Sequence, residues 1–311
     1  MAALTAGPSW ADEPARDPAP WSHYFGGNAG PTTFTPTMFG DLLSAGIGGG
    51  LIGFQGLRVD VPVFRGGFKI AENESPQPQD RVFLNYNYYR DVGSVEDVHR
   101  ETIGLEKALL SGRASVGLRL PFFQVRGNGA GHDTNVGDLS VVLKYAVIDE
   151  PASGSTLSTG LVITAPTGPE AYSFVVRDGR IDEIHPWLLQ PFVGYLWKRG
   201  DLFVHGFTSV AVPTDSNDVT IAFVDVGLGY WLFRGGGVLS AIVPTVEAHV
   251  NVPLDHRDTD HVPRFRNSVD LTAGFHFVFR DRLSVGLAVG VPVTSPRLFD
   301  VEAIANLNYR F

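Results

Sequence analysis

Polar and apolar residues alternate along most of this chain, and the alternation is clearest over residues 301–311. Every second residue from Val301 to Phe311 is apolar, and Ile304 is the only apolar residue on the opposite face. That face otherwise carries Glu302, Asn306, Asn308 and Arg310. Because residues i and i+2 of a strand share a face, the segment predicts a strand with one apolar and one polar side. A strand of about ten such residues either crosses a bilayer in a barrel with a wet interior or forms the edge of a soluble sheet.

Segments with the same alternation recur from Arg81 to the last residue. Each spans about 10–14 residues, and together they predict about 12 antiparallel strands, an even number as in most bacterial membrane barrels. The connections between them alternate between long and short. The long ones include a polar loop over residues 91–100 and the connections 126–136, 165–186 and 253–266. If the first strand rises from the periplasm, the long connections lie on the outer side and both termini lie in the periplasm.

The faces opposite the apolar stripes favour a membrane barrel over a soluble one. They are rich in Gly, Ser, Thr, Asn and charged residues, as the interior of a membrane barrel is. A soluble barrel would place its apolar residues inside. We therefore predict an all-β fold, an antiparallel transmembrane β-barrel of about 12 strands (range about 10–14) in the outer membrane of a Gram-negative-type envelope. Aromatic residues at strand ends, among them Trp187, Trp197 and Trp231, are expected to form girdles at the membrane surfaces.

Composition agrees with this fold class and excludes several functions. The chain is 44% hydrophobic but has no apolar run near the ~18 residues that a membrane-spanning helix requires. It contains no cysteine, which removes disulfides, thiolate chemistry and Cys-ligated metals. The net charge of −9 argues against nucleic acid as a partner, because that binding depends on Lys and Arg that neutralise phosphates. We expect no cofactor.

The part of the chain before Arg81 does not follow the barrel pattern. Residues 1–20 are expected to be the remnant of a secretory signal and a linker: Ser9-Trp10-Ala11 has the small-x-small form of a cleavage site, although no Lys or Arg precedes it. Residues 21–80 could form a periplasmic extension, a plug inside the lumen or an added strand pair, and we favour a segment partly tucked into the barrel. Residues 35–43 within it predict a short helix. The transmembrane barrel is then residues 81–311.

The alternation assigns one set of ionisable residues to the lumen. These candidate pore-lining residues are Glu106, Arg119, Lys144, Asp225, Glu247, His249, Asp270, His276, Glu302 and Arg310. They carry both signs of charge, and charged side chains at a constriction set the selectivity of a pore. The alternative is that they only fill a polar interior, with acids and bases paired between neighbouring strands.

Metal binding and catalysis have weak support in the sequence. Glu247 and His249 share one face of a strand. Asp270 and His276 of the next strand are expected to face the same way, so the group could bind a metal or exchange protons. A hydrogen-bonded network in the lumen is the alternative that we favour. An outer-membrane lipid hydrolase needs a His-x-Ser arrangement on a lipid-facing strand, and no such sequence occurs here. We therefore expect that the protein is not an enzyme.

The C-terminal residues resemble a known signal. The ending Leu307-Asn308-Tyr309-Arg310-Phe311 is similar to the sequence by which the barrel-assembly machinery recognises outer-membrane proteins, with Leu307, Tyr309 and Phe311 as the alternating apolar residues. The region 81–311 also resembles the outer-membrane channels associated with the meta-pathway of phenol degradation. That family is defined by barrel periodicity and not by a catalytic motif.

This resemblance implies a channel for diffusion of small molecules, aromatic or apolar ones among them, across the outer membrane. The expected partners are outer-membrane lipid, the barrel-assembly machinery and a small-molecule solute, and we favour a monomer. A barrel of about 12 strands is too narrow for a wide pore, because the lumen grows with strand number. Two alternatives stay open: a structural or adhesive surface barrel whose long loops bind partners, and an outer-membrane lipid hydrolase.

Overall fold

The computed structural model describes most of the chain. The described residues are 35–41, 45–51, 58–64, 68–92, 96–127, 133–168, 174–177, 180–183, 185–216, 218–255, 267–295, 297 and 299–311. The predicted signal remnant and linker, residues 1–20, lie outside this part of the chain.

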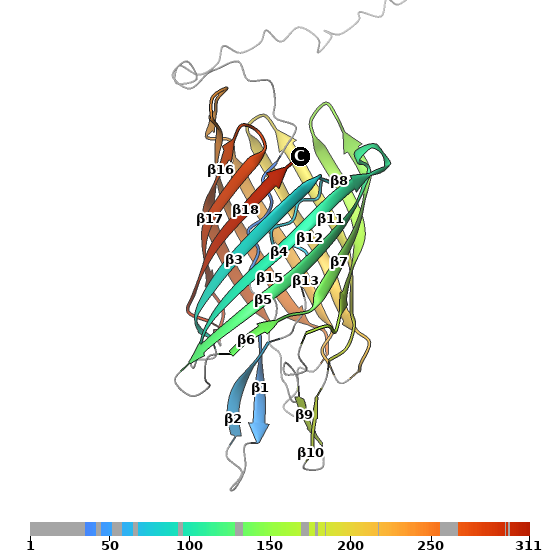
Figure 1. The fold of residues 1–311 in the computed structure, drawn as a ribbon, viewed down its shortest axis with the longest axis vertical. Helices are drawn as coiled ribbons and strands as arrows, with labels where there is room; N and C mark the ends of the chain where they lie inside the picture. Colours follow the sequence, from blue (N-terminus) through green and yellow to red (C-terminus); the bar gives the residue numbers. More distant parts are fainter. Residues whose placement is uncertain are drawn as a thin grey trace, which may run out of the picture.

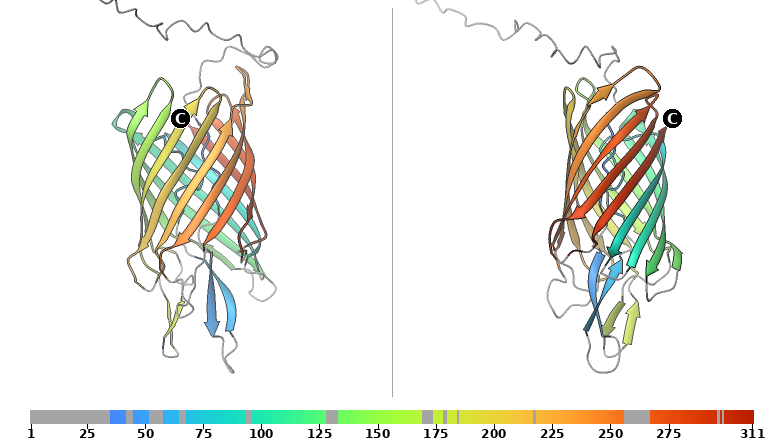
Figure 2. Two further views of the ribbon diagram at one scale, coloured as in Figure 1. Left: turned by 180° about the vertical axis from the view of Figure 1, so that it is seen from behind. Right: turned by 90° about the vertical axis from the view of Figure 1, so that its left-hand side faces the viewer.

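Twelve long antiparallel strands close into a barrel (Figure 1). They are β3 (Arg81–Val92), β4 (Glu96–Leu109), β5 (Ala114–Gly127), β7 (Leu139–Glu150), β8 (Ser155–Ala165), β11 (Leu188–Arg199), β12 (Leu202–Pro213), β13 (Ile221–Tyr230), β15 (Leu239–Pro253), β16 (Ser268–Phe279), β17 (Leu283–Pro292) and β18 (Val301–Arg310). Each pairs with its neighbour in this order, and β18 pairs with β3, where Arg310 lies opposite Arg81. Figure 2 shows the closed wall from two other sides. The predicted fold class and strand number are confirmed.

Short elements lie at the ends of the barrel. They are the hairpins β1 (Ala45–Leu51) with β2 (Arg58–Phe64) and β9 (Phe174–Arg177) with β10 (Arg180–Glu183), strand β6 (Asp133–Val136) along β5, strand β14 (Phe233–Arg234) along β15, and the 3₁₀ helix η1 (Leu110–Gly112). Both hairpins extend beyond one end of the barrel, and the C-terminus lies at the other end (Figure 1). None of the helical turns in the described residues is long and apolar enough to cross a membrane.

The connections sort by length between the two ends, with two exceptions: residues 231–238 are long at the C-terminal end, and residues 93–95 are short at the other end. The other turns at the C-terminal end are tight: in the three-residue connection 280–282 between β16 and β17, Arg280 and Asp281 adopt φ of 47° and 58°, as the central residues of a type I′ turn do. At the other end, the polar loop predicted for residues 91–100 is mostly strand, and only residues 93–95 join β3 to β4. The reason is a pair of side-chain contacts between the strands: the hydroxyl of Tyr88 donates to Asp97 at 2.9 Å, and Tyr86 binds His99 at 2.7 Å.

Burial alternates along the strands as the sequence predicts. On β11, Gln190 and Phe192 face inward and are 2% and 3% exposed, whereas Val193 and Trp197 face outward and are 45% and 49% exposed. Trp187, just before the strand, is also 49% exposed, so aromatic side chains lie at both of its ends. The outer face is apolar and the inner face is mostly polar, which is the reverse of a soluble barrel.

One predicted girdle residue faces the interior. Trp231 is 5% exposed and packs with Phe203 and Val243. The guanidinium carbon of Arg234 lies 4.4 Å from the centre of its ring. The alternating pattern ends with β13 at Tyr230, so it did not determine the direction of the next side chain.

Phenylalanines on the inner face lie over glycines of neighbouring strands. Phe203 of β12 is paired with Gly229 of β13, where an added Cβ would be 2.0 Å from the ring. The same pairing occurs for Phe83 with Gly104, Phe192 with Gly160 and Phe207 with Gly194. Each ring occupies the space that a side chain on the glycine would need. These inward rings explain why apolar residues occur on both faces of β12.

Candidate functional site in the barrel lumen

Two stretches of the N-terminal region lie inside the barrel, and we call them together the lumen segment: residues 35–41 and 68–80. They run antiparallel, because partners later in the first stretch lie earlier in the second: the amide of Met38 donates to the carbonyl of Glu74 at 2.9 Å, Gly40 lies against Glu72, and Asp41 pairs with Lys69 at 2.5 Å. The β1–β2 hairpin joins them outside the barrel (Figure 1). Residues 35–41 are not helical, contrary to the predicted short helix. Their amides bind partners in the lumen instead of forming helical hydrogen bonds.

The return stretch ends at the C-terminal end of the barrel. The carbonyl of Asp80 accepts a hydrogen bond from the amide of Phe311 at 3.3 Å, and β3 begins at the next residue. Since Met38 pairs with Glu74, the first stretch also starts toward this end. The lumen segment therefore passes through the barrel, turns in the hairpin beyond the far end and returns to the first strand.

One wall of the lumen carries four cations that we call the basic cluster. They are Arg81 on β3, Arg100 on β4, Arg119 on β5 and Lys144 on β7, all buried. Three of them converge on the Glu74 carboxylate of the lumen segment: Arg81 at 2.9 Å, Lys144 at 2.7 Å and Arg119 at 2.5 Å. The fourth, Arg100, binds Glu72 at 2.7 Å. These are charge-assisted hydrogen bonds, the strong class.

The basic cluster contains one acid of its own. Glu106 on β4 binds Arg81 at 2.8 Å and Lys144 at 2.9 Å, and it accepts from Ser115 at 2.7 Å. Arg119 also donates to the backbone carbonyl of Glu72 at 2.7 Å. Backbone and side chains of the lumen segment therefore both contribute to its attachment on this wall.

The opposite wall is acidic. Asp225 on β13, Glu247 on β15 and Asp270 on β16, with His249 on β15, form what we call the acidic wall, and all are buried. In the strand order, β8, β11 and β12 separate it from the basic cluster on one side, and β17 and β18 separate it on the other. The lumen segment presents a lysine here: the Lys69 ammonium lies 2.7 Å from Asp225.

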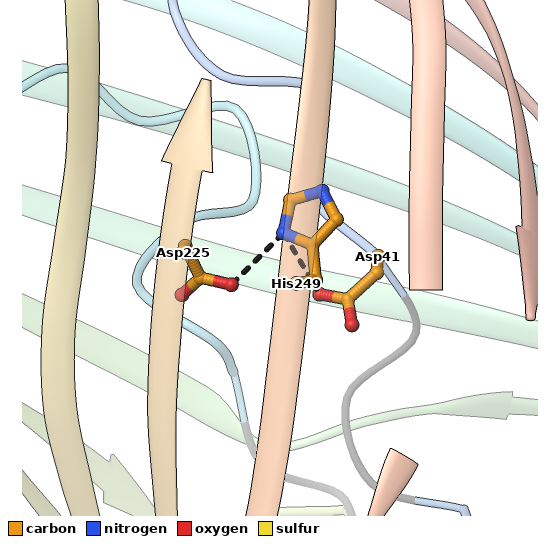
Figure 3. Close-up of side chains that lie close together, drawn as sticks. All are labelled: Asp41, Asp225 and His249. Carbon is orange, nitrogen blue, oxygen red and sulfur yellow. Dashed lines mark hydrogen bonds and ion pairs between the residues drawn. The ribbon is translucent and has the colours of Figure 1, made fainter. Parts of the chain in front are cut away.

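Asp41, Asp225 and His249 come together from three separate parts of the chain (Figure 3). His249 Nδ1 lies 2.8 Å from Asp225 and 3.7 Å from Asp41. This donor set has the composition of a metal site. However, the ammonium of Lys69 lies 2.5 Å from Asp41 and 2.7 Å from Asp225, where it takes the place that a cation would need. The arrangement is an ion-pair network that holds the lumen segment.

Glu247 binds the backbone of the lumen segment. Its carboxylate accepts the amides of Phe39 at 2.8 Å and of Gly40 at 3.1 Å, and it lies 3.3 Å from His249 Nε2. The Phe39 ring stacks on His276 with ring centres 4.2 Å apart. The sequence grouped four residues for metal or acid–base chemistry: Glu247, His249, Asp270 and His276. In the structure they contact different partners in the lumen segment and its surroundings.

Buried charges of the lumen segment have displaced pKa values. Burial by itself lowers the pKa of Lys69, but Asp225 and Asp41 beside it raise that pKa above its ordinary value. Burial would raise the pKa of Glu74, but the cations Lys144, Arg81 and Arg119 around it hold that pKa well below its usual range. These charges are therefore present together at neutral pH, and the attachment is ionic on both walls.

An apolar patch separates the two charged walls. Its wall residues are Val142 on β7, Val162 on β8, Phe192 on β11 and Phe207 on β12. Met38, Phe68 and Ile70 of the lumen segment pack against it. The ring of Phe68 also lies 3.9 Å from the guanidinium carbon of Arg119, so the patch adjoins the basic cluster.

The other predicted site residues lie at the wall or the rim. Glu302 is buried and accepts from Asn87 at 2.7 Å. Arg310 is partly exposed near the C-terminal end and donates to the Asp281 carbonyl at 2.9 Å. Leu307, Tyr309 and Phe311 face outward and are 41%, 43% and 60% exposed. The pore-lining and assembly roles of these residues stay predictions. His205 and Ser209 of β12 both face inward and are buried, away from lipid.

Sequence comparison gives no family, and structural comparison gives the fold. No protein-family model and no curated protein matches the chain. The structure of an outer membrane channel from Pseudomonas putida F1 is 15% identical, with a TM-score of 0.54, over 75% of this chain and 96% of that one. KdgM porin is 8% identical, with a TM-score of 0.48, over 74% and 99% of the two chains. NanC porin is 9% identical, with a TM-score of 0.48, over 74% and 98%. The chain has the fold of an outer-membrane β-barrel.

Proposed function

We propose that this protein is an outer-membrane channel for small molecules and that its lumen segment closes the channel in the state described. The observation that carries this proposal is the filling of a polar lumen by a segment that is attached mainly through ion pairs. The finer expectations are that both termini are periplasmic, that the protein is a monomer, and that its solutes are small molecules with aromatic or apolar ones among them.

The outer surface supports placement in a membrane. Large apolar side chains are exposed on eleven of the twelve barrel strands, all except β8, among them Leu84, Ile103, Leu118, Leu143, Val193, Val226, Val246, Phe275 and Leu287. A soluble monomer rarely exposes a continuous apolar area above a few hundred Å² (about 300–600 Å²). A bilayer would cover this belt without any change in the fold.

The chemistry of the filling supports a removable plug. An apolar core excludes water permanently, whereas ionic contacts such as Glu74 with Arg81 can exchange for contacts with water. Removing one partner of a buried ion pair costs much more than the pair itself contributes, so loss of a few contacts would release the segment. The lumen also contains polar groups suited to water: among the described residues, the side-chain amide of Asn306 and both ring nitrogens of His276 have no protein hydrogen-bond partner.

Single-channel conductance of the refolded full-length protein in a planar bilayer tests the proposal. The double variant Glu72→Gln/Glu74→Gln removes the charges that bind the basic cluster, and we expect it to open far more often than wild type. Arg90→Met, which removes an exposed cation that pairs with Asp300 outside the lumen segment, is the matched control and should behave as wild type.

A cross-link tests whether the lumen segment is the gate. The Asn308 side chain donates to Asn73 at 2.9 Å, which joins β18 to the lumen segment, and the chain has no cysteine of its own. In Asn73→Cys/Asn308→Cys, a disulfide or a short bismaleimide link should abolish openings, and cleavage of the disulfide should restore them. Unchanged openings after complete cross-linking would show that the segment is not the gate. No conductance in any folded form would favour a structural barrel.

A further inference from the structure

We propose that the basic cluster, with the apolar patch beside it, is a binding site for small aromatic carboxylates, and that these solutes compete with the lumen segment for it. This inference names the solute class of the proposed channel and rests on that function.

The cations around Glu74 form a carboxylate-binding site. One oxygen of its carboxylate accepts from Arg81 at 2.9 Å and Lys144 at 2.7 Å, and the other binds Arg119. Three cations from three different strands thus surround one carboxylate that is not part of the wall. Arg and Lys arranged around both oxygens form a carboxylate-recognition site. The chain fills this site with a carboxylate of its own.

The ring of Phe68 shows that the same site accepts an aromatic group. Its ring lies 3.9 Å from the guanidinium carbon of Arg119, and the wall residue Phe83 lies 4.7 Å from the same carbon. A guanidinium plane attracts aromatic rings as well as carboxylates. Arg119 therefore contacts an aromatic ring and a carboxylate of the lumen segment at once. A molecule that carries a carboxylate on an aromatic ring offers both groups together and could replace Phe68 and Glu74 at this arginine.

Charge favours an anion once the lumen segment leaves. The basic cluster and Glu106 then contain four cations and one carboxylate, a net charge of +3. A partly desolvated cluster of unpaired cations is unfavourable, so an incoming anion is stabilised there. The acidic wall across the lumen repels the same anion and keeps it on the basic side. The apolar patch would contact the ring, since its residue Val142 lies two positions before Lys144 on the same face of β7.

The affinity of the full-length protein for benzoate tests this site by calorimetry in detergent micelles. Benzamide keeps the ring without the charge, and acetate keeps the charge without the ring. We expect Glu72→Gln/Glu74→Gln to bind benzoate at least about tenfold more tightly than wild type, because its own competitor is weakened. Benzamide and acetate should each bind at least about tenfold more weakly than benzoate in this variant.

Variants of the wall identify the site. Adding Arg119→Met to the double glutamine variant should weaken benzoate binding at least about tenfold, and Arg119→Lys should weaken it less, because it keeps the charge but not the planar fork. Adding Arg90→Met instead, at an exposed cation that pairs with Asp300, should leave the affinity unchanged. Heat-modifiable mobility on SDS gels shows whether each barrel is folded. If Arg119→Met does not fold, Arg119→Lys still tests the role of Arg119.

Several outcomes would overturn the inference. Equal affinity for benzoate and benzamide would show that the site does not recognise the carboxylate. Equal affinity for benzoate and acetate would show that it does not recognise the ring. An equal loss with Arg90→Met would show general attraction of anions and no specific site. The double glutamine variant is tested in parallel for conduction. A channel that conducts without preference for benzoate contradicts this inference alone, whereas a benzoate site in a barrel that never conducts contradicts only the proposed function.

Discussion

The ammonium nitrogen of Lys69 lies 2.7 Å from Oδ1 of Asp225, and this contact joins the lumen segment to β13. Both side chains are fully buried. Lys69 is also 2.5 Å from Asp41, which precedes the β1–β2 hairpin, so a single lysine joins the two stretches of the lumen segment and one wall of the barrel. Its loss would leave two carboxylates close together with only the His249 ring between them.

Lys69→Met is expected to release the lumen segment. The variant leaves Asp41 and Asp225 buried without the lysine that they share, and removing one partner of a buried pair costs about 3–5 kcal/mol. Single-channel records should therefore show more frequent openings than wild type. Lys69→Met/Asp41→Asn also removes one of the two carboxylates. Its frequency of openings should therefore lie between that of Lys69→Met and that of wild type. A single variant that stays as closed as wild type would show that this contact does not hold the segment.

The sequence predicted the wall of the lumen better than its contents. Alternation along strands placed Glu106, Arg119 and Lys144 on the inner face, because the direction of a strand side chain depends only on its position in the pleat. Arg100 shares that face but was assigned to a polar loop, since the contacts of Tyr86 and Tyr88 with the end of β4 could not be seen in a local pattern.

The lumen segment had no comparable signal. Lys69 and Glu74 belong to a stretch without strand or helix periodicity, and their positions depend on partners far away in the chain, such as Asp225 and Lys144. The sequence therefore left a plug as one of three alternatives for residues 21–80. The density of charges in Lys69, Glu72 and Glu74 was the one available hint, because isolated charges of both signs in a barrel extension need partners of opposite sign.

Acid is expected to weaken the attachment of the lumen segment only well below pH 5. The pKa of Glu74 is lowered when it is docked against Arg81, Arg119 and Lys144, with Glu106 nearby, whereas a free glutamate has a pKa of about 4.3. A group with a lowered docked pKa contributes fully above its free pKa, and this contribution is lost as the pH falls through the docked pKa. Open probability should stay low between about pH 7 and pH 5 and rise in stronger acid.

The glutamine variant is the control for the acid response. Glu74→Gln cannot titrate at this position, so its openings should be frequent at pH 7 and change less in acid than those of wild type. A wild-type channel that opens fully between pH 7 and pH 6 would contradict the assignment of this carboxylate to the closed state, because both the docked and the free form are ionised in that range.

Gly229→Ala is expected to destabilise the barrel through Phe203. The added Cβ would lie 2.0 Å from the ring, which is packed against Leu196 and Trp231 and cannot move freely. Forcing an extra methyl group into such a site costs about 1–3 kcal/mol. The temperature at which the folded band is lost on SDS gels should fall. Gly236→Ala, where an added Cβ meets nothing within 4 Å, is the matched control and should leave this temperature unchanged.

Arginine scanning of the outer face tests whether a bilayer surrounds the barrel. Val193, in the middle of β11, and Leu202, the first residue of β12, are similarly exposed at 45% and 37%. In lipid, arginine costs about 2–4 kcal/mol at the midplane and about 0–1 kcal/mol near the interface. Val193→Arg should therefore lower the free energy of unfolding in vesicles much more than Leu202→Arg does. Equal and small effects would mean that both positions face water, and the membrane placement would then be wrong.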